Sequence, residues 1–236
     1  MGWRGRMVLL VAVTGLSCTS TYQVRNAPAS GFLGDYSQLE RGGRGRPLLI
    51  YRDPDVDFTA YKRVQLDPVA EYIGAHSRLQ KIAPEDRQAL LDYFHATLRK
   101  RLAEGYERVD EAGAGVLRLR VAVTDAQGSK VAMDTLSTVV PVGLALSALQ
   151  KVTLGKTLTA GSVRIEAEAL DGGTGKRLAA LVDERAGAKV SGRLDKWSKW
   201  QDARDAFDFW GDRLGARLAE LRAKKAAGAG PAAGAT

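Results

Sequence analysis

The sequence predicts an α/β (α+β) fold, a two-layer sandwich in which two amphipathic helices pack on one face of a mostly antiparallel or mixed sheet. Two observations lead to this prediction. Several segments alternate apolar and polar residues with the period of two of a half-buried strand, and two longer segments carry apolar residues at the spacing of one helical face. In chain order the elements read strand, helix, strand, insertion, two strands and helix.

The first predicted strand and helix lie in the first half of the chain. Residues 61–68 alternate as a strand does and end at Pro68. The helix begins near Pro84, because a proline suits the first helical turn, and it stops at Gly105. Its apolar stripe consists of Leu91, Phe94, Leu98 and Leu102.

The next three strands place charged residues on one face of the sheet. Residues 116–125 alternate strictly, and residues 162–187 predict a hairpin whose turn, DGGTG at 171–175, supplies the positive backbone angles that such a loop needs. The charged side chains that alternate with apolar ones are Arg118, Arg120, Arg164, Glu166 and Glu168. We therefore expect this face to be wet or covered by polar neighbours.

The last predicted helix spans residues 197–224. Its acidic residues come early and its basic residues late, which agrees with the helix dipole. Its apolar stripe consists of Phe207, Trp210, Leu214, Leu218 and Leu221. The tail, 223–236, has low complexity and is expected to be disordered, so that residues 61–222 form a single domain.

The composition excludes several classes of site. The 236 residues include one cysteine and two histidines, which rules out a disulfide framework within the chain and a thiolate zinc site. The 35 basic residues against 27 acidic ones give a net charge of +8, but the basic residues form no stripe with interleaved aromatics. Nucleic-acid binding is therefore not supported, and we expect neither a metal nor a cofactor.

The N-terminus has the pattern of an export signal. Arg4 and Arg6 precede an apolar run, residues 7–13, that is too short to span a membrane. Residues 1–17 are therefore predicted to be a signal peptide. Small residues then precede the only cysteine, Cys18, as in the lipobox of bacterial lipoproteins, where the cysteine sulfur is acylated. That motif prefers Leu three positions before the cysteine, where this chain has Gly15.

Two interpretations of Cys18 remain open. In the favoured one, Cys18 is acylated and anchors the chain to a membrane. In the other, an ordinary secretory signal is cut nearby and Cys18 stays a free thiol. Thr19 follows the cysteine, where lipoproteins retained in the inner membrane of enteric-type bacteria usually have Asp, so the resemblance implies the outer membrane, facing the periplasm. Residues 18–60 are expected to form the lipid anchor and a tether with partly packed loops, and 41–47, RGGRGRP, a flexible break.

An uncharged segment, residues 135–150, lies in the insertion between predicted strands. It is too short to span a membrane and contains Pro141 and Gly143. One interpretation is a buried crossover packed on the sheet. The other is an exposed element that contacts an envelope protein partner or the membrane surface. The residues that would make this contact are Val139, Val140, Val142, Leu144, Leu146 and Leu149.

No catalytic constellation is found among the polar residues. His95 adjoins the first apolar stripe and is expected to pack at the helix edge, and neither it nor His76 has a carboxylate at ligand spacing. DGGTGK, 171–176, lacks the spacing of a phosphate-binding loop. Asp53, Asp55 and Asp57 lack the Gly and distal Glu of a calcium loop, so solvated carboxylates are favoured.

Four further segments form a specific combination: SGFLGDYSQL at 30–39, the PVG element within VVPVGLALSAL, the hairpin at 161–187, and the final helix with AFDFWGDRL. Together with the lipobox-like start they resemble the bacterial lipoprotein family catalogued as domain of unknown function 3313. The resemblance covers most of residues 18–222. It implies localisation and fold but no catalytic residues, and the acylated cysteine of the family falls on Cys18.

Three functions are compatible with these observations. The first is a non-enzymatic, membrane-anchored module of the cell envelope that binds or assembles with a partner. The second is an envelope hydrolase, which requires a nucleophile and base or perturbed carboxylates in a cleft. The third is a small-ligand carrier, which requires a closed apolar cavity. We favour the first, because the sequence displays neither of the other sites.

Overall fold

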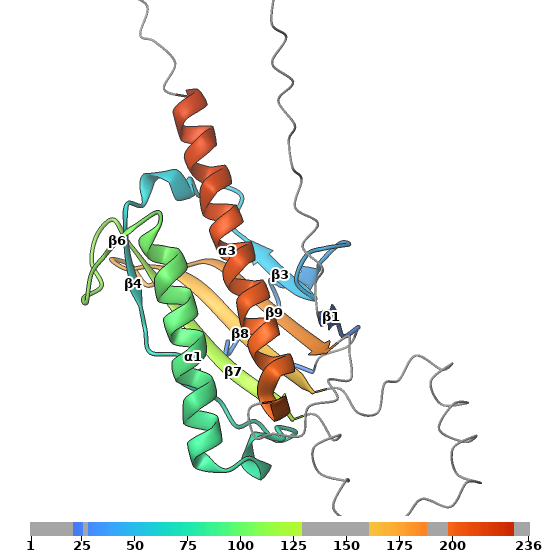
Figure 1. Cartoon of the computed structure of the whole chain (residues 1–236). Helices are drawn as coiled ribbons and strands as arrows, with labels where there is room; N and C mark the ends of the chain where they lie inside the picture. Colours follow the sequence, from blue (N-terminus) through green and yellow to red (C-terminus); the bar gives the residue numbers. More distant parts are fainter. Residues whose placement is uncertain (1–20, 26–27, 129–160, 188–197, 229–236) are drawn as a thin grey trace, which may run out of the picture.

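The computed structural model describes residues 21–25, 28–128, 161–187 and 198–228, with side chains up to residue 221. The described part of the chain begins with strands and ends with a helix (Figure 1). The strands are β1 (Thr21–Gln23), β2 (Glu40–Arg41), β3 (Leu49–Arg52), β4 (Arg63–Leu66), β5 (Ala70–Glu71), β6 (Glu107–Arg108), β7 (Val116–Gln127), β8 (Ser162–Asp171) and β9 (Arg177–Gly187). The helices are η1 (Phe58–Ala60), η2 (Leu79–Lys81), α1 (Pro84–Ala103), η5 (Ser198–Trp200) and α3 (Gln201–Gly228).

The strands form one open, mixed sheet, as the sequence predicts. Their order is β2-β3-β9-β8-β7-β4-β6, and β1 and β5 pair with β9 and β7. The long central strands β7, β8 and β9 are antiparallel to one another, whereas β4 is parallel to both β7 and β6. Because α1 lies between β4 and β7 in the chain, it forms the crossover that a parallel pair requires.

The helices α1 and α3 lie side by side on one face of the sheet (Figure 1). Phe94 of α1 stacks on Phe207 of α3 with ring centroids 4.4 Å apart, and both rings are buried above Val163 and Ile165 of β8 in one core cluster. The predicted packing is therefore confirmed. The α1 stripe begins one residue earlier than predicted, because Leu90 rather than Leu91 is buried, in the same cluster as residues of η2.

The N-terminal region is more ordered than the sequence indicates. Residues 21–52, expected to belong to a tether with loops, contain β1, β2 and β3. Both β1 and β3 pair with the outer edge of β9, whose backbone groups need partners. Residues 41–47, expected to be a flexible break, include the turn that joins β2 to β3.

The C-terminal helix also differs in length from the prediction. We expected disorder from residue 223, but α3 continues to Gly228. The added stretch is rich in Ala and Lys, both strong helix formers, which accounts for the extension. Among the described residues, no helix combines the length and apolar character needed to cross a membrane.

Candidate functional site: the charged face of the sheet

The face of the sheet opposite the helices carries a row of charged side chains that are almost entirely buried. On β8, Arg164, Glu166 and Glu168 have exposed fractions of 8%, 0% and 5%. The apolar residues that alternate with them point to the helices, as the period of a strand requires. The sequence analysis left open whether this face is solvent-exposed or covered. The structure shows that it is covered over β8, whereas Arg118 and Arg120 of β7 stay partly exposed.

The cover is the segment 28–39, which we call the strap. It packs a small apolar cluster onto this face, with Leu33 buried against Ala180 and Val182 of β9. Arg177 donates to the backbone oxygens of Leu33 at 2.5 Å and of Asp35 at 2.7 Å. The strap therefore makes both apolar contacts and hydrogen bonds with the charged face.

Glu166 is the central attachment of the strap. Its Oε1 accepts a hydrogen bond from the backbone N–H of Ser30 at 2.8 Å, and its Oε2 accepts one from the hydroxyl of Tyr36 at 2.5 Å. The Tyr36 oxygen in turn accepts from the N–H of Gly31 at 2.8 Å and of Leu33 at 3.3 Å. Burial, followed by the hydrogen bond to Glu166, raises the pKa of Tyr36, so the hydroxyl stays a donor.

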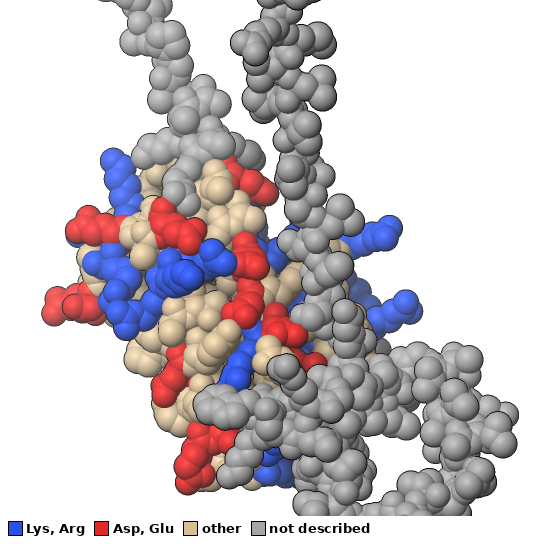
Figure 2. All heavy atoms as spheres, viewed as in Figure 1, with Lys and Arg blue, Asp and Glu red and all other residues tan. Residues whose placement is uncertain are grey.

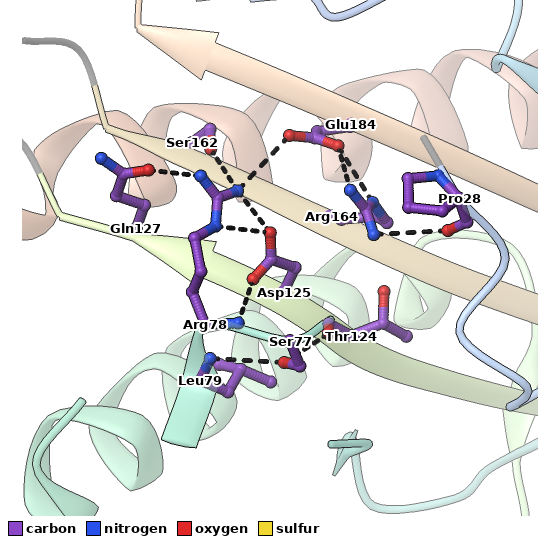
Figure 3. Close-up of polar contacts among 10 residues, drawn as sticks. All are labelled: Pro28, Ser77, Arg78, Leu79, Thr124, Asp125, Gln127, Ser162, Arg164 and Glu184. Atoms are coloured by element: carbon purple, nitrogen blue, oxygen red, sulfur yellow. Dashed lines mark hydrogen bonds and ion pairs between the residues drawn. The ribbon is translucent and has the colours of Figure 1, made fainter. Parts of the chain in front are cut away.

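A second attachment holds the segment between β5 and α1, residues 72–83, which we call the link. Arg78, from this link, donates from its backbone N–H to Oδ1 of Asp125 at 2.7 Å and from Nε to Oδ2 at 2.8 Å (Figure 3). Its guanidinium also contacts Gln127 and lies 3.7 Å from Oε1 of Glu184. Arg164 closes the group with two hydrogen bonds to Oε2 of Glu184, at 2.8 and 2.9 Å.

The charges in this group balance. Two guanidinium groups, of Arg78 and Arg164, face two carboxylates, of Asp125 and Glu184 (Figure 3). Burial alone lowers the pKa of Arg78, but the hydrogen bond and charge of Asp125 and the charge of Glu184 outweigh it and raise the pKa. Buried charges are tolerated in such a setting because each is paired and hydrogen-bonded.

A third attachment involves Glu168. It pairs with Arg120 at 2.5 Å and with Arg177 at 2.9 Å. The Arg120 guanidinium lies 5.2 Å from the centre of the Phe32 ring of the strap. Carboxylates on this face are therefore bound to arginines, to Tyr36 or to backbone N–H groups, and the arrangement fixes the strap and the link to the sheet.

The histidines lie outside this network. His76 is exposed, and His95 is half-buried on α1, where we expected it to pack. Burial, and then the charges of Arg99 and Arg108, lower the pKa of His95. Within the described residues, no three His, Cys, Asp or Glu side chains gather in a way that could hold a metal ion.

The aspartates of the calcium-loop pattern have separate partners. Asp53 pairs with Lys176 at 2.7 Å, and this hydrogen bond, followed by that of the Asp55 N–H, lowers its pKa. Asp57 caps η1 by accepting from Thr59. Residues 171–175 form the predicted hairpin turn, in which Gly175 has a φ of +73°.

The predicted lipidation and contact residues fall outside the described ranges. Cys18 precedes Thr21, the first described residue, and the contact segment, 135–150, lies between Gly128 and Gly161. The sequence analysis missed Arg78, Asp125, Glu184 and the strap residues Ser30 and Tyr36. Alternating charges in strands signal a polar face, but partners such as Arg78, 47 positions from Asp125, carry no local signal.

Solved structures share limited similarity with the chain. PelC from Paraburkholderia phytofirmans, a dodecamer, is 12% identical, with 68% of this chain and 93% of that chain covered and a TM-score of 0.35. A Xanthomonas campestris protein assigned to DUF330 is 10% identical, with 74% and 93% covered and a TM-score of 0.38. A minor lipoprotein from Acinetobacter baumannii is 12% identical, with 69% and 95% covered and a TM-score of 0.32.

The comparison at family level is decisive. A search of curated proteins gives no match. The model of one family, described as "Protein of unknown function (DUF3313)", matches residues 28–214, which include the strap, the charged face and most of the sheet and both helices. The match begins at the strap and confirms the resemblance found in the sequence. The chain therefore belongs to the DUF3313 family.

Proposed function

We propose that the chain is a lipoprotein of the bacterial cell envelope, anchored through acylated Cys18 in the outer membrane and facing the periplasm, where it acts as a non-enzymatic interaction or assembly module. The observation that carries this proposal is the position of Cys18. The only cysteine of the chain follows the signal-like residues 1–17, and two residues separate it from the first strand. An acyl group there would join the membrane directly to the sheet.

The charged face supports an interaction role rather than a catalytic one. Glu166, Glu168 and Glu184 each bind a described arginine, tyrosine or backbone group, and all three are buried. Hydrolases need a nucleophile and base that a substrate can reach. The geometry favours a rigid body that presents its outer surfaces to partners.

The uncharged segment, 135–150, is the surface that we propose for contact with an envelope partner or the membrane. The strand ends that bracket it lie at the same end of the sheet as the N-terminus. Gln127 pairs with Ser162, Ser162 with Ala186, and the neighbouring Gly187 with Thr21. The two strand ends that flank the insertion therefore lie at the end of the sheet where the proposed anchor would be attached.

Membrane fractionation and fatty-acid labelling test the anchor. Cys18→Ser should abolish labelling and move the protein from the membrane to the soluble fraction, because the thiol is the acylated group. Ser17→Ala, which keeps a small residue before the cysteine, is the matched control and should stay labelled and membrane-bound. A wild-type chain that carries no label and remains in the membrane would contradict the proposal.

A further inference from the structure

The edge of the sheet next to the proposed anchor carries a group of exposed arginines that form no ion pair with the described residues. Residues 21–52 contain five arginines and two acidic residues. Arg25, Arg41, Arg44 and Arg46 are exposed, and none of them forms an ion pair with a described residue. Figure 2 shows Lys and Arg side chains projecting from the flank where β3 lies in Figure 1. We call these four residues the arginine edge.

The turn that presents Arg44 and Arg46 has a defined geometry. The N–H of Arg46 donates to the oxygen of Gly43 at 2.9 Å, which closes a four-residue turn with Arg44 and Gly45 at its tip. Gly45 has a φ of +76°, which a glycine at the third position of such a turn adopts without strain. The N–H of Gly42 closes the base of the turn on the oxygen of Leu48 at 2.9 Å.

This turn is attached to β1. The side chain of Gln23 donates both to the backbone oxygen of Arg46 and to Oδ1 of Asp183, each at 2.7 Å. The N–H of Leu48 also donates to Oδ1 of Asp183, at 3.3 Å. The guanidinium of Arg213, from α3, donates to the oxygen of Gly45. Arg44 and Arg46 are thus carried by a turn that is fixed to β1, α3 and β9.

The distance to the membrane follows from the length of the chain. Two residues separate Cys18 from Thr21, so Cys18 lies within about 10 Å of the start of β1. The exposed ring of Tyr22, on β1 between the anchor and the turn, has the amphipathic character of residues found at membrane interfaces. An acyl chain on Cys18 would therefore hold the arginine edge beside the lipid headgroups.

We propose that the arginine edge binds the anionic headgroups of the membrane in which Cys18 is anchored, and so lays the β1–β3 edge of the sheet on the bilayer. This inference rests on the proposed lipid anchor. Arginines near an anionic bilayer each add to binding, and the contribution falls with salt. The arginine edge sets the orientation of the folded domain, while the acyl chain keeps the domain on the membrane.

The test uses the processed chain from residue 18 with Cys18→Ser, so that the acyl anchor plays no part. Binding is measured by cosedimentation with vesicles of phosphatidylglycerol and phosphatidylethanolamine, and with vesicles of phosphatidylcholine alone. The variant Arg44→Gln with Arg46→Gln is compared with Arg99→Gln and Arg108→Gln, two exposed arginines on α1 and β6. The control removes the same charge from β6, at the opposite edge of the sheet, and from α1, which contacts β6.

We expect salt-sensitive binding to the anionic vesicles, about tenfold weaker in the Arg44→Gln, Arg46→Gln variant and nearly unchanged in the control. Equal losses in both double variants would show that net charge alone binds, and would overturn the inference. Equal binding to phosphatidylcholine, or no binding to anionic vesicles at low salt, would also overturn it. Failure of the anchor appears separately, as absent labelling of the wild-type chain. Thermal melting checks that both variants fold.

Discussion

Asp183 joins three elements through one buried carboxylate. Its Oδ2 accepts from Nε1 of Trp210 on α3 at 2.8 Å, and its Oδ1 accepts from Gln23 of β1 and from the N–H of Leu48. Asp183 is 3% exposed. A buried carboxylate must have donors, and here they come from segments far apart in the chain. The side chain thus fixes α3 and β1 on β9.

Among the partners of Asp183, Trp210 is the one whose loss we expect to lower the free energy of unfolding most. Trp210→Ala removes a buried ring that packs near Phe94 and Phe207, and it takes one donor from Asp183. The free energy of unfolding should fall by about 3–5 kcal/mol in denaturant titrations. Trp210→Phe keeps an aromatic ring but loses the donor, and should cost about 1–3 kcal/mol. A loss below about 1 kcal/mol in the alanine variant would show that α3 does not pack as described.

The strap is the element whose order depends most on single hydrogen bonds. It has no helix or strand before β2, yet Glu166 and Arg177 hold it at four backbone positions, directly or through Tyr36. Buried backbone groups outside helices and strands need such side-chain partners. The strap therefore has a fixed path over the charged face.

Tyr36→Phe should loosen the strap. The change removes the donor to Glu166 and the acceptor for the N–H groups of Gly31 and Leu33, so stability should fall by about 1–3 kcal/mol and these two amides should exchange faster. Tyr22→Phe, at an exposed position, is the control and should change neither quantity.

The pH dependence of this effect has a definite sign. The pKa of Tyr36 is raised above 10.0, first by burial and then by the hydrogen bond to Glu166. The stabilisation from its hydroxyl is therefore complete below pH 10.0 and is lost as the pH rises through the folded-state pKa. The stability difference between wild type and Tyr36→Phe should shrink in strong alkali, and a difference that grows there would contradict this assignment.

The elements differ in how far the sequence predicts them. The elements with ten or more residues each are β7, β8, β9, α1 and α3. Elements of this length contain enough repeats for their periodicity to be recognised in the sequence. β1, β2 and β3 have two to four residues, set among glycines and arginines. β1 and β3 are strands because the edge of β9 offers them partners, and β2 is a strand because β3 does. These partners are a property of the folded sheet.

The same limit applies to the charged face. The alternation in Arg164, Glu166 and Glu168 predicts a polar face, but a solvated face and a buried one give the same pattern. Only the strap decides between them, and its hydrogen bonds to Glu166 join residues 136 and 130 positions apart in the sequence.

At the scale of the whole molecule, the end of the sheet where β1 begins is also the end where β7 stops and β8 starts, on either side of the insertion that contains residues 135–150. Leu144→Asp together with Leu146→Asp tests which role that segment has. If it is a contact surface, the melting temperature should hold while liposome or partner binding disappears. If it is core, the protein should lose several kcal/mol and aggregate, because unpaired charges would be buried. Unchanged stability with unchanged binding would contradict both interpretations.

The pairing of β1 with β9 would let the proposed acyl anchor on Cys18 act at two distances from the folded domain. A pull on Cys18 enters the fold at Thr21, whose hydroxyl and backbone oxygen each accept from Arg185 at 2.7 Å. Because the load would enter at β1, this three-residue strand would be the first part of the sheet to separate. The chain could then extend up to Ser30, which Glu166 holds in place. This would lengthen the connection between Cys18 and the folded domain by roughly 30 Å. The rest of the domain would stay folded. It would no longer lie on the bilayer but would be joined to it by an extended segment, so that it could contact a partner farther from the membrane.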